Sequence, residues 1–270
     1  MINEELANQP LEDEEYELIG GFPLPYLKEI RFNWVAVPDK NEYPFNIPAF
    51  SGVKSISFHR KVTFFVGENG SGKSTLLEAI ADKCGFSSQG GGRNNIFGIK
   101  EEDISLEKIL TLSWMPKVKG GFFLRAETFF NFAGYLDELA NDPFSGGKDV
   151  YLPYGGESLN RQSHGESFLS LFLNRFDQKG IYLLDEPEAA LSPQRQLAFL
   201  RVMHQLEEKG NAQFIIATHS PILMGFPNAD IYDFDHSPLR KIAYEDTKHY
   251  QITKMFLNDT EGFLKKLLRD

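Results

Sequence analysis

Apolar and polar positions along the chain follow two different periods. Short apolar runs predict β-strands over residues 53–58, 62–66, 122–126, 181–185 and 213–218, with a further short strand near Ile231. Stretches with apolar residues three or four positions apart predict helices over residues 72–83, 128–140, 165–177 and 193–209 and at the C-terminus. Because the predicted strands and helices alternate, we expect an α/β fold in which flanking helices cover both faces of a mostly parallel sheet.

Two regions depart from this alternation. Residues 26–35 alternate loosely between apolar and polar side chains, which is typical of an antiparallel strand at the edge of a sheet. Residues 85–98 are rich in glycine and predict an excursion from the core. We therefore expect one domain over residues 21–270, with a small helical lobe inserted at about residues 85–177.

The composition is that of a folded protein with an acidic end. The 270 residues are 41% hydrophobic and 24% charged, which excludes wholesale disorder, a collagen repeat and a coiled-coil rod. The formal net charge is −10, and seven of the acidic residues lie within residues 1–20. We expect this segment to be a solvated acidic tail, although the same composition suits a docking arm for a basic partner. The net charge gives no support for nucleic acid as a partner.

The cysteine content and the apolar runs bear on the cellular compartment. Cys84 is the single cysteine, so an internal disulfide framework is excluded and a reducing compartment is favoured. The acidic start differs from a secretory signal, and no stretch approaches the roughly 20 apolar residues of a membrane span. We expect a cytoplasmic protein that does not insert into a membrane directly.

Residues 67–74 read GENGSGKS and fit the pattern G-x-x-x-x-G-K-S, the Walker A motif, between an apolar strand and a helix. The glycines let backbone N–H groups curl around a phosphate, and the helix directs its positive N-terminus at the same place. Lys73 is expected to neutralise the β- and γ-phosphates, and the Ser74 hydroxyl to ligate Mg²⁺. The alternative is a glycine-rich turn with a surface lysine. The residues expected to contact a nucleotide are Gly67, Glu68, Asn69, Gly70, Ser71, Gly72, Lys73, Ser74 and Thr75.

A second motif ends the apolar strand over residues 181–185. Asp185 and Glu186 follow the apolar residues directly, which is the Walker B pattern. We expect Asp185 to ligate Mg²⁺ and Glu186 to polarise a water molecule for in-line attack on the γ-phosphorus. An acidic strand end exposed to solvent is the alternative. Ser192 and Pro193 predict the N-cap and first turn of the next helix.

Two further segments complete an ordered set. Residues 162–166 precede an apolar helix, where taken alone they suit an N-cap, and His219 follows the strand over residues 213–218. The order of phosphate loop, this segment, the Asp-Glu-Pro strand end and the histidine resembles that of ATP-binding-cassette (ABC) ATPases, over about residues 26–235. Within that superfamily the chain looks closest to small, stand-alone bacterial AAA/ABC-type ATPases, which implies a P-loop NTPase fold.

The resemblance implies ATP hydrolysis with Mg²⁺ at a composite site in a head-to-tail homodimer. The signature motif, which contacts the nucleotide of the opposite subunit, aligns with Ser163, His164, Gly165 and Glu166. The resemblance also implies that His219 contacts the γ-phosphate and the attacking water. An incidental polar residue at a strand end is the alternative for His219.

The sequence departs from the family pattern at three positions. His164 replaces a glycine of the signature, Ser192 replaces the usual aspartate, which puts the coupling across the dimer in doubt, and Glu127 stands where a glutamine is usual. We expect Glu127 to approach Mg²⁺ through water. The resemblance also implies an aromatic residue that stacks on adenine, for which Tyr43 and Phe45 are the candidates unless they belong to the core.

The resemblance leaves the biological role open. We expect a soluble ATPase that drives or regulates an unidentified protein partner. The alternatives are the nucleotide-binding subunit of a membrane transporter and an ATPase of DNA repair or defence. The altered signature argues against the transporter, and the interval between Lys73 and Ser163 is too short for the long coiled coil of a DNA-repair head.

Overall fold

The central sheet has six strands in the order β5-β6-β7-β3-β8-β9. The computed structural model describes residues 25–87, 105–142, 144, 147–161, 164–175 and 179–269, so the expected acidic tail over residues 1–20 lies outside it. The strands are β3 (Val62–Val66), β5 (Gly120–Arg125), β6 (Gly180–Asp185), β7 (Ala212–Ala217), β8 (Asp230–Asp233) and β9 (Arg240–Lys241). All neighbouring pairs are parallel except β8 and β9. The predicted mostly parallel sheet is confirmed.

A second sheet of three antiparallel strands, in the order β2-β1-β4, packs near the first. Its strands are β1 (Leu27–Phe32), β2 (Ser55–Ser57) and β4 (Leu110–Trp114). The expectation of an edge strand over residues 26–35 is wrong, because β1 is the central strand of this sheet. Trp34 lies beyond the end of β1. Its ring stacks on Phe32 with the ring centroids 5.6 Å apart, and its Nε1 donates to the Val53 carbonyl at 2.6 Å.

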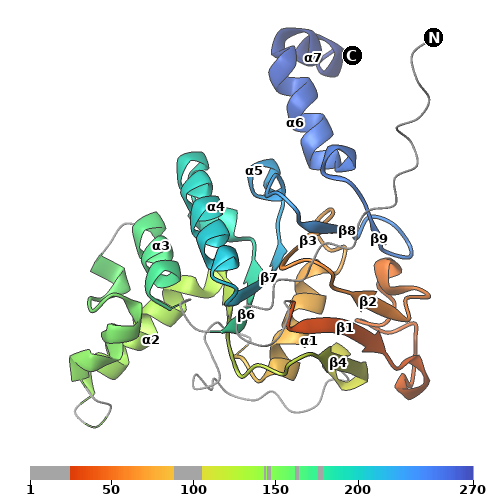
Figure 1. Ribbon diagram of the computed structural model, residues 1–270. Coiled ribbons are helices and arrows are strands. Elements are labelled where there is room, and N and C mark those ends of the chain that lie inside the picture. The colour runs from red at the N-terminus through yellow and green to blue at the C-terminus, as the bar shows by residue number, and fades with distance from the viewer. Residues whose placement is uncertain are drawn as a thin grey trace, which may run out of the picture.

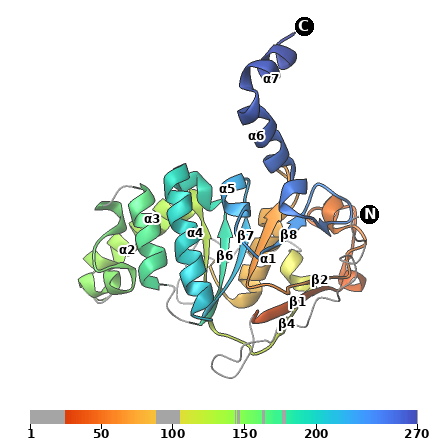
Figure 2. The ribbon, with the colours of Figure 1, turned by 45° about the horizontal axis from the view of Figure 1, so that its top comes forward.

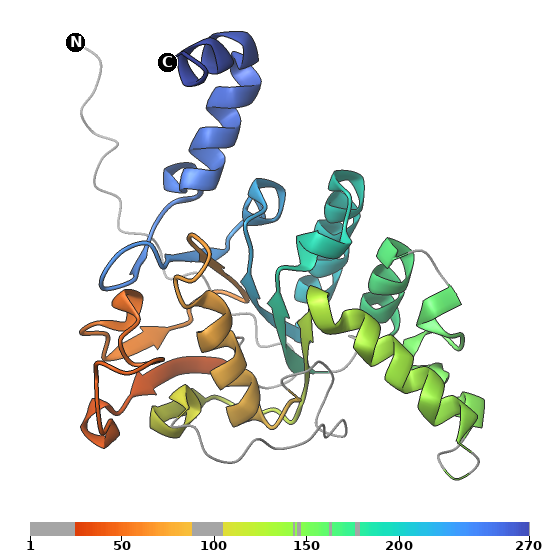
Figure 3. The same cartoon turned by 180° about the vertical axis from the view of Figure 1, so that it is seen from behind.

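Helices cover both faces of the six-stranded sheet (Figures 1 and 3). The helices of the described residues are α1 (Lys73–Cys84), α2 (Phe129–Asn141), α3 (His164–Arg175), α4 (Pro193–Glu208), α5 (Pro221–Met224), α6 (Lys248–Asn258) and α7 (Thr260–Leu267), and the last two lie away from the sheet. One apolar cluster joins α1 and the three-stranded sheet to the face that carries Phe65. The other joins α2, α3 and α4 to the face that carries Phe64. The two-residue period of β3 therefore sends adjacent phenylalanines into separate halves of the core.

The helix boundaries follow local chemistry. Ser192 caps α4 as predicted, because its hydroxyl accepts the backbone N–H of Arg195 at 3.4 Å and Pro193 occupies the first turn. Helix α1 ends at Gly85, whose φ of 76° is left-handed. The start of α4 and the end of α1 are thus set by residues whose type can be recognised in the sequence.

The last two helices project from the β8 side of the sheet (Figure 2). Only the first turn of α6 approaches the strand ends, and the outer part of this arm exposes Ile252, Met255, Leu257 and Leu267. Among the helices in the described part of the chain, none is long and apolar enough to cross a bilayer.

Candidate functional site

The loop between β3 and α1 depends on glycine at two crowded positions. Gly67 has a φ of 140°, and a Cβ atom placed there would lie 2.9 Å from Oδ1 of Asp235. Gly72 has a φ of 103°, and a Cβ atom there would lie 2.8 Å from Cγ2 of Ile47. A side chain at either position would be strained by its backbone and blocked by its neighbour. The loop therefore has the tight curvature that residues 67–74 predict.

Lys73 curls back into this loop. Its Nζ donates to the carbonyl oxygens of Gly67 at 2.7 Å and Glu68 at 2.9 Å. Burial lowers the pKa of the Lys73 ammonium, and the carboxylates of Glu186 and Asp185 oppose this shift. A buried positive charge at the N-terminus of α1 suits an anionic ligand.

Ser74 and Asp185 meet at the start of α1. The Ser74 hydroxyl donates to Oδ1 of Asp185 at 2.9 Å, although 111 positions separate the two residues. Asp185 ends the fully buried strand β6 and is 3% exposed. These two residues line a pocket of about 210 Å³ together with Arg125, Glu127 and Glu186. A hydroxyl and carboxylates are the oxygen donors that Mg²⁺ prefers, so the residues present fit this ion.

Arg125 is a member of this pocket that the sequence analysis did not single out. It ends β5 directly opposite Asp185, and its Nε donates to Asp185 Oδ2 at 2.8 Å. The guanidinium also pairs with Glu78 of α1. Burial acts to lower the pKa of Arg125, and the two carboxylates outweigh it and raise that pKa. The available signal was the position of Arg125 at the carboxyl end of a strand parallel to β6.

Glu186 has a strained backbone. Its φ and ψ of 51° and 52° are left-handed, which is unfavourable for a residue with a Cβ atom. The backbone N–H of Glu186 donates to the Ala217 carbonyl at 2.9 Å, which holds this conformation against the end of β7. Burial, and then the negative charge of Asp185, raises the pKa of the Glu186 carboxyl. The geometry aims this side chain into the same pocket as Asp185.

His219 follows β7 and faces Glu186. Its Nε2 lies 3.6 Å from Glu186 Oε1, and its Nδ1 lies 2.9 Å from Nε2 of His249. Within the described part of the chain, Nε2 of His219 and Oγ of Ser71 are buried without a hydrogen-bond partner. Buried polar atoms are normally paired, so these two atoms beside the phosphate loop fit a bound polar ligand.

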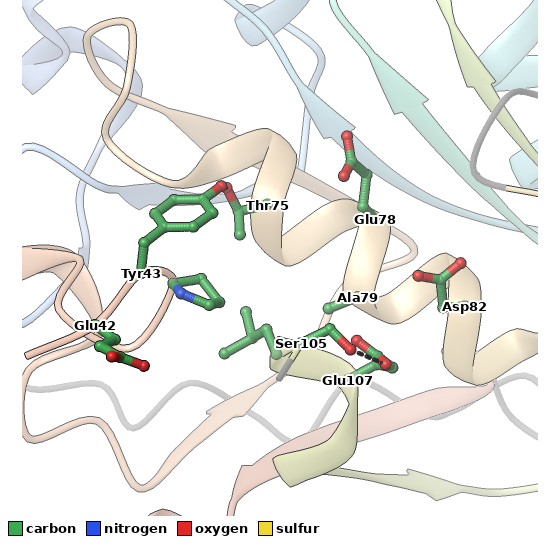
Figure 4. A pocket seen from close by; sticks show the side chains of 10 residues that line it. Glu42, Tyr43, Thr75, Glu78, Ala79, Asp82, Ser105 and Glu107 are labelled. Carbon is green, nitrogen blue, oxygen red and sulfur yellow. Dashed lines mark hydrogen bonds between the residues drawn. The ribbon is translucent and has the colours of Figure 1, made fainter. Parts of the chain in front are cut away.

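A larger pocket of about 540 Å³ lies along α1, between that helix and the segments around residues 43 and 106 (Figure 4). The Tyr43 ring lies at its rim, and its hydroxyl is 3.0 Å from Oγ1 of Thr75. Tyr43 is 69% exposed, whereas Phe45 is 5% exposed and belongs to the core. Of the two aromatic candidates, only Tyr43 offers a ring face to a ligand.

The predicted signature segment is described only in part. Ser163 lies outside the described residues, and His164 and Gly165 begin α3. Glu166 is exposed, with its carboxylate 3.5 Å from Arg195 of α4. Within the described ranges, α3 adds no residue to the lining of the pocket around Asp185. Helix α3 packs on the sheet face opposite to α1.

Family comparisons match both halves of this site. A model described as "AAA domain" matches residues 45–130, and one described as "AAA domain, putative AbiEii toxin, Type IV TA system" matches residues 167–225. The first range includes the phosphate loop, and the second includes Asp185, Glu186 and His219. Over these two ranges the chain is therefore similar to AAA-domain P-loop ATPases.

Solved structures and one curated protein are also similar to this chain. The cbiO1 structure from Clostridium perfringens, described as part of the ABC transporter complex cbiONQ, is 15% identical, with a TM-score of 0.50 over 90% of this chain and 100% of that chain. The SMC head domain from Thermotoga maritima is 18% identical, with a TM-score of 0.43 over 81% of this chain and 98% of that chain. Protein ea59 of Escherichia phage lambda is 37% identical over 70 residues, which are 24% of this chain and 13% of ea59. At this identity, cbiO1 supports the P-loop fold.

Proposed function

We propose that this protein binds ATP together with Mg²⁺ and hydrolyses the terminal phosphoanhydride bond. The observation that carries the proposal is the 2.9 Å hydrogen bond between Ser74 and Asp185, because it joins the Walker A and Walker B motifs at one point. Ser74 and Asp185 would hold Mg²⁺, with Glu127 reaching it through water. When bound there, Mg²⁺ supplies positive charge to the phosphate oxygens.

The side chains of the pocket have complementary roles. Lys73 and the N–H groups of the phosphate loop bind and orient the β- and γ-phosphates. Glu186 accepts a hydrogen bond from the attacking water and aligns it with the γ-phosphorus. His219 contacts the γ-phosphate through Nε2. Tyr43 supplies a ring face for adenine.

We propose that the complete site forms between two copies of the chain in head-to-tail orientation. Ser163 and the N-terminus of α3, with His164, Gly165 and Glu166, would contact the nucleotide bound by the opposite copy. The packing of α3 and α1 on opposite sheet faces supports this, because α3 does not serve the pocket of its own chain. An unidentified protein partner in the cytoplasm would couple to the resulting opening and closing.

The decisive experiment measures phosphate release and nucleotide binding by purified variants. Lys73→Ala is expected to abolish ATP binding, and Glu186→Gln to bind ATP, hydrolyse it poorly and accumulate as a dimer in sedimentation. Lys83→Ala is the matched control, since it removes an exposed lysine from the other end of α1. Unchanged binding by Lys73→Ala would overturn the phosphate-loop assignment. Monomers at saturating ATP and Mg²⁺ would overturn the composite site.

A second candidate role is an ATPase of a defence system. The description of the family model over residues 167–225 names a putative toxin of a type IV toxin–antitoxin system, which favours this role over that of a transporter subunit. ATP turnover measured with DNA, with RNA and with the products of neighbouring genes would decide it. Stimulation by one of these supports the role, and stimulation by a copurifying membrane protein supports the transporter instead.

A further inference from the structure

The first turn of α6 contacts the candidate site at two points. Nε2 of His249 lies 2.9 Å from Nδ1 of His219. One residue earlier, Nζ of Lys248 donates to Oδ2 of Asp235 at 2.9 Å, and Oδ1 of Asp235 accepts the backbone N–H of Glu68 at 2.7 Å. One helical turn is therefore joined both to the histidine after β7 and to the phosphate loop.

His219 is held by two hydrogen bonds. Its backbone N–H donates to Oε1 of Glu188 at 2.6 Å, and its Nδ1 faces His249. Its remaining ring nitrogen, Nε2, is buried 3.6 Å from Oε1 of Glu186, with no hydrogen-bond partner in the described ranges. The ring therefore presents one unpaired nitrogen toward the position expected for the γ-phosphate and the attacking water.

The contact between the two rings determines the tautomer of His219. A neutral imidazole has one N–H donor and one acceptor nitrogen. If His249 donates from Nε2, then Nδ1 of His219 accepts and Nε2 of His219 carries the proton. The reverse arrangement places the lone pair of that Nε2 against the carboxylate of Glu186, which leaves two acceptors facing each other. The geometry therefore favours donation by His249.

We propose that His249 is a positioning residue for His219, which fixes the orientation of its ring and places its proton on Nε2. The proposal rests on the proposed function, since His219 contributes to turnover only if ATP is hydrolysed at this site. In this arrangement His219 donates a hydrogen bond to a γ-phosphate oxygen without having to reorient. Pre-oriented donors of this kind stabilise developing negative charge.

Burial and the charges nearby favour the neutral form of both imidazole rings. Burial, then Lys73, then the neighbouring His249 lowers the pKa of His219, while Glu68 and Asp235 act in the opposite direction. Burial is also the main cause that lowers the pKa of His249. At neutral pH each ring therefore has one donor and one acceptor nitrogen, which the contact requires.

The start of α6 is fixed without the help of His249. Thr247 is buried and caps the helix by accepting the backbone N–H of Tyr250 at 3.3 Å. The hydroxyl of Tyr244 donates to the Pro221 carbonyl at 2.8 Å. Because these bonds and the Lys248 ion pair remain, a substitution of His249 should leave α6 in place.

The kinetic test compares two substitutions of His249 in the full-length protein. His249→Leu is expected to lower kcat for ATP about tenfold while KM stays unchanged, as for other residues that orient a catalytic side chain. His249→Gln keeps an amide N–H near the position of Nε2 and should restore most of the loss. In a His219→Ala background, His249→Leu should cost no further activity. His204→Leu on α4, with an exposed side chain, is the control.

The outcomes separate the two proposals. Equal kcat values for the wild-type protein and His249→Leu overturn the role of His249, and so do equal losses in the Leu and Gln variants. Absence of turnover by the wild-type protein overturns the proposed function instead. Long-range ¹H–¹⁵N spectra of the imidazole rings then decide the role of His249: the Nε2–H tautomer of His219, lost in His249→Leu, supports it, and the Nδ1–H tautomer in the wild-type protein overturns it.

Discussion

Arg125 and Asp185 end two paired parallel strands side by side, with Nε and Oδ2 2.8 Å apart. The other oxygen of Asp185 accepts the hydroxyl of Ser74 at 2.9 Å. A nearly buried carboxylate is thereby neutralised by a cation of the same chain, and it is already oriented for a ligand on the Ser74 side. Without such a partner, a carboxylate at this depth would carry a large desolvation cost.

Substituting Arg125→Met is expected to lower the free energy of unfolding by about 2 kcal/mol, because Asp185 loses a charge-assisted hydrogen bond in a largely buried setting. Mg²⁺ together with nucleotide should recover most of this loss, since the ion then supplies the missing positive charge. Urea denaturation with and without both ligands measures the effect. Arg31→Met is the matched control: it breaks an exposed ion pair with Glu29, which solvent screens, and should change the stability far less. Equal losses in the two variants would contradict the account.

Tyr43 is predicted to set the affinity for the purine base. Tyr43→Ala should weaken ATP binding about tenfold, because a stacked aromatic ring contributes about 1 kcal/mol beyond its buried area. Tyr43→Phe keeps the ring and loses only the hydrogen bond to Thr75, so its affinity should stay close to that of the wild-type protein. Calorimetric titration with ATP measures both. Equal affinities of the Ala and Phe variants would show that the base binds elsewhere.

The sequence was informative where one local pattern determines the structure. The apolar run of β3 followed by glycines and a lysine predicts a buried strand, a tight loop and a helix, and Ser192 with Pro193 predicts the start of α4. In each case the residues that cause the structure are neighbours in the chain. The roles of the predicted site residues stay predictions, although the structure brings Ser74 and Asp185 together.

The missed features all depend on contacts between distant segments. Strand β4 pairs with β1 across about 80 positions, so the sequence did not show that β1 is central. Arg125 meets Asp185, and His249 meets His219, through sheet order and the path of α6. Periodicity gives the face on which a residue lies and not the element that packs against it.

The backbone of Glu186 is expected to lower the stability of the protein, while its carboxylate is needed for turnover. Glu186→Gly relieves the left-handed backbone and should raise the free energy of unfolding by about 1 kcal/mol, while turnover is lost with the carboxylate. Among the residues that the structure describes, Asn228 is the other non-glycine residue with positive φ. Because asparagine tolerates this conformation, Asn228→Gly is expected to give a smaller gain with unchanged turnover. Thermal denaturation and phosphate release test both variants. A Glu186→Gly protein that is less stable than the wild type would show that the backbone is not strained.

Asp82 makes folding stability depend on pH. Burial, followed by the charges of Glu107 and Glu78, raises the pKa of Asp82 from 3.8 to about 6. Below about pH 4 the carboxyl is protonated in both the folded and the unfolded chain. As the pH rises from about 4 to about 6, the unfolded chain releases the proton first, so this group lowers the stability across that window. Above about pH 6, Asp82 is ionised in both states, and its contribution to the free energy of unfolding no longer changes with pH.

Asp82→Asn should therefore match the wild-type stability near pH 4 and exceed it at pH 7. Asp82 lines the pocket along α1, and its side chain still reaches solvent there. Because this solvent screens the repulsion, we expect a gain of at most about 1 kcal/mol. Glu138→Gln on the exposed surface of α2 controls for the change in net charge. Urea midpoints at the two pH values measure the difference between the variants. If Asp82→Asn were more stable than the wild type by the same amount at both pH values, the amide side chain and not the ionisation of Asp82 would cause the gain.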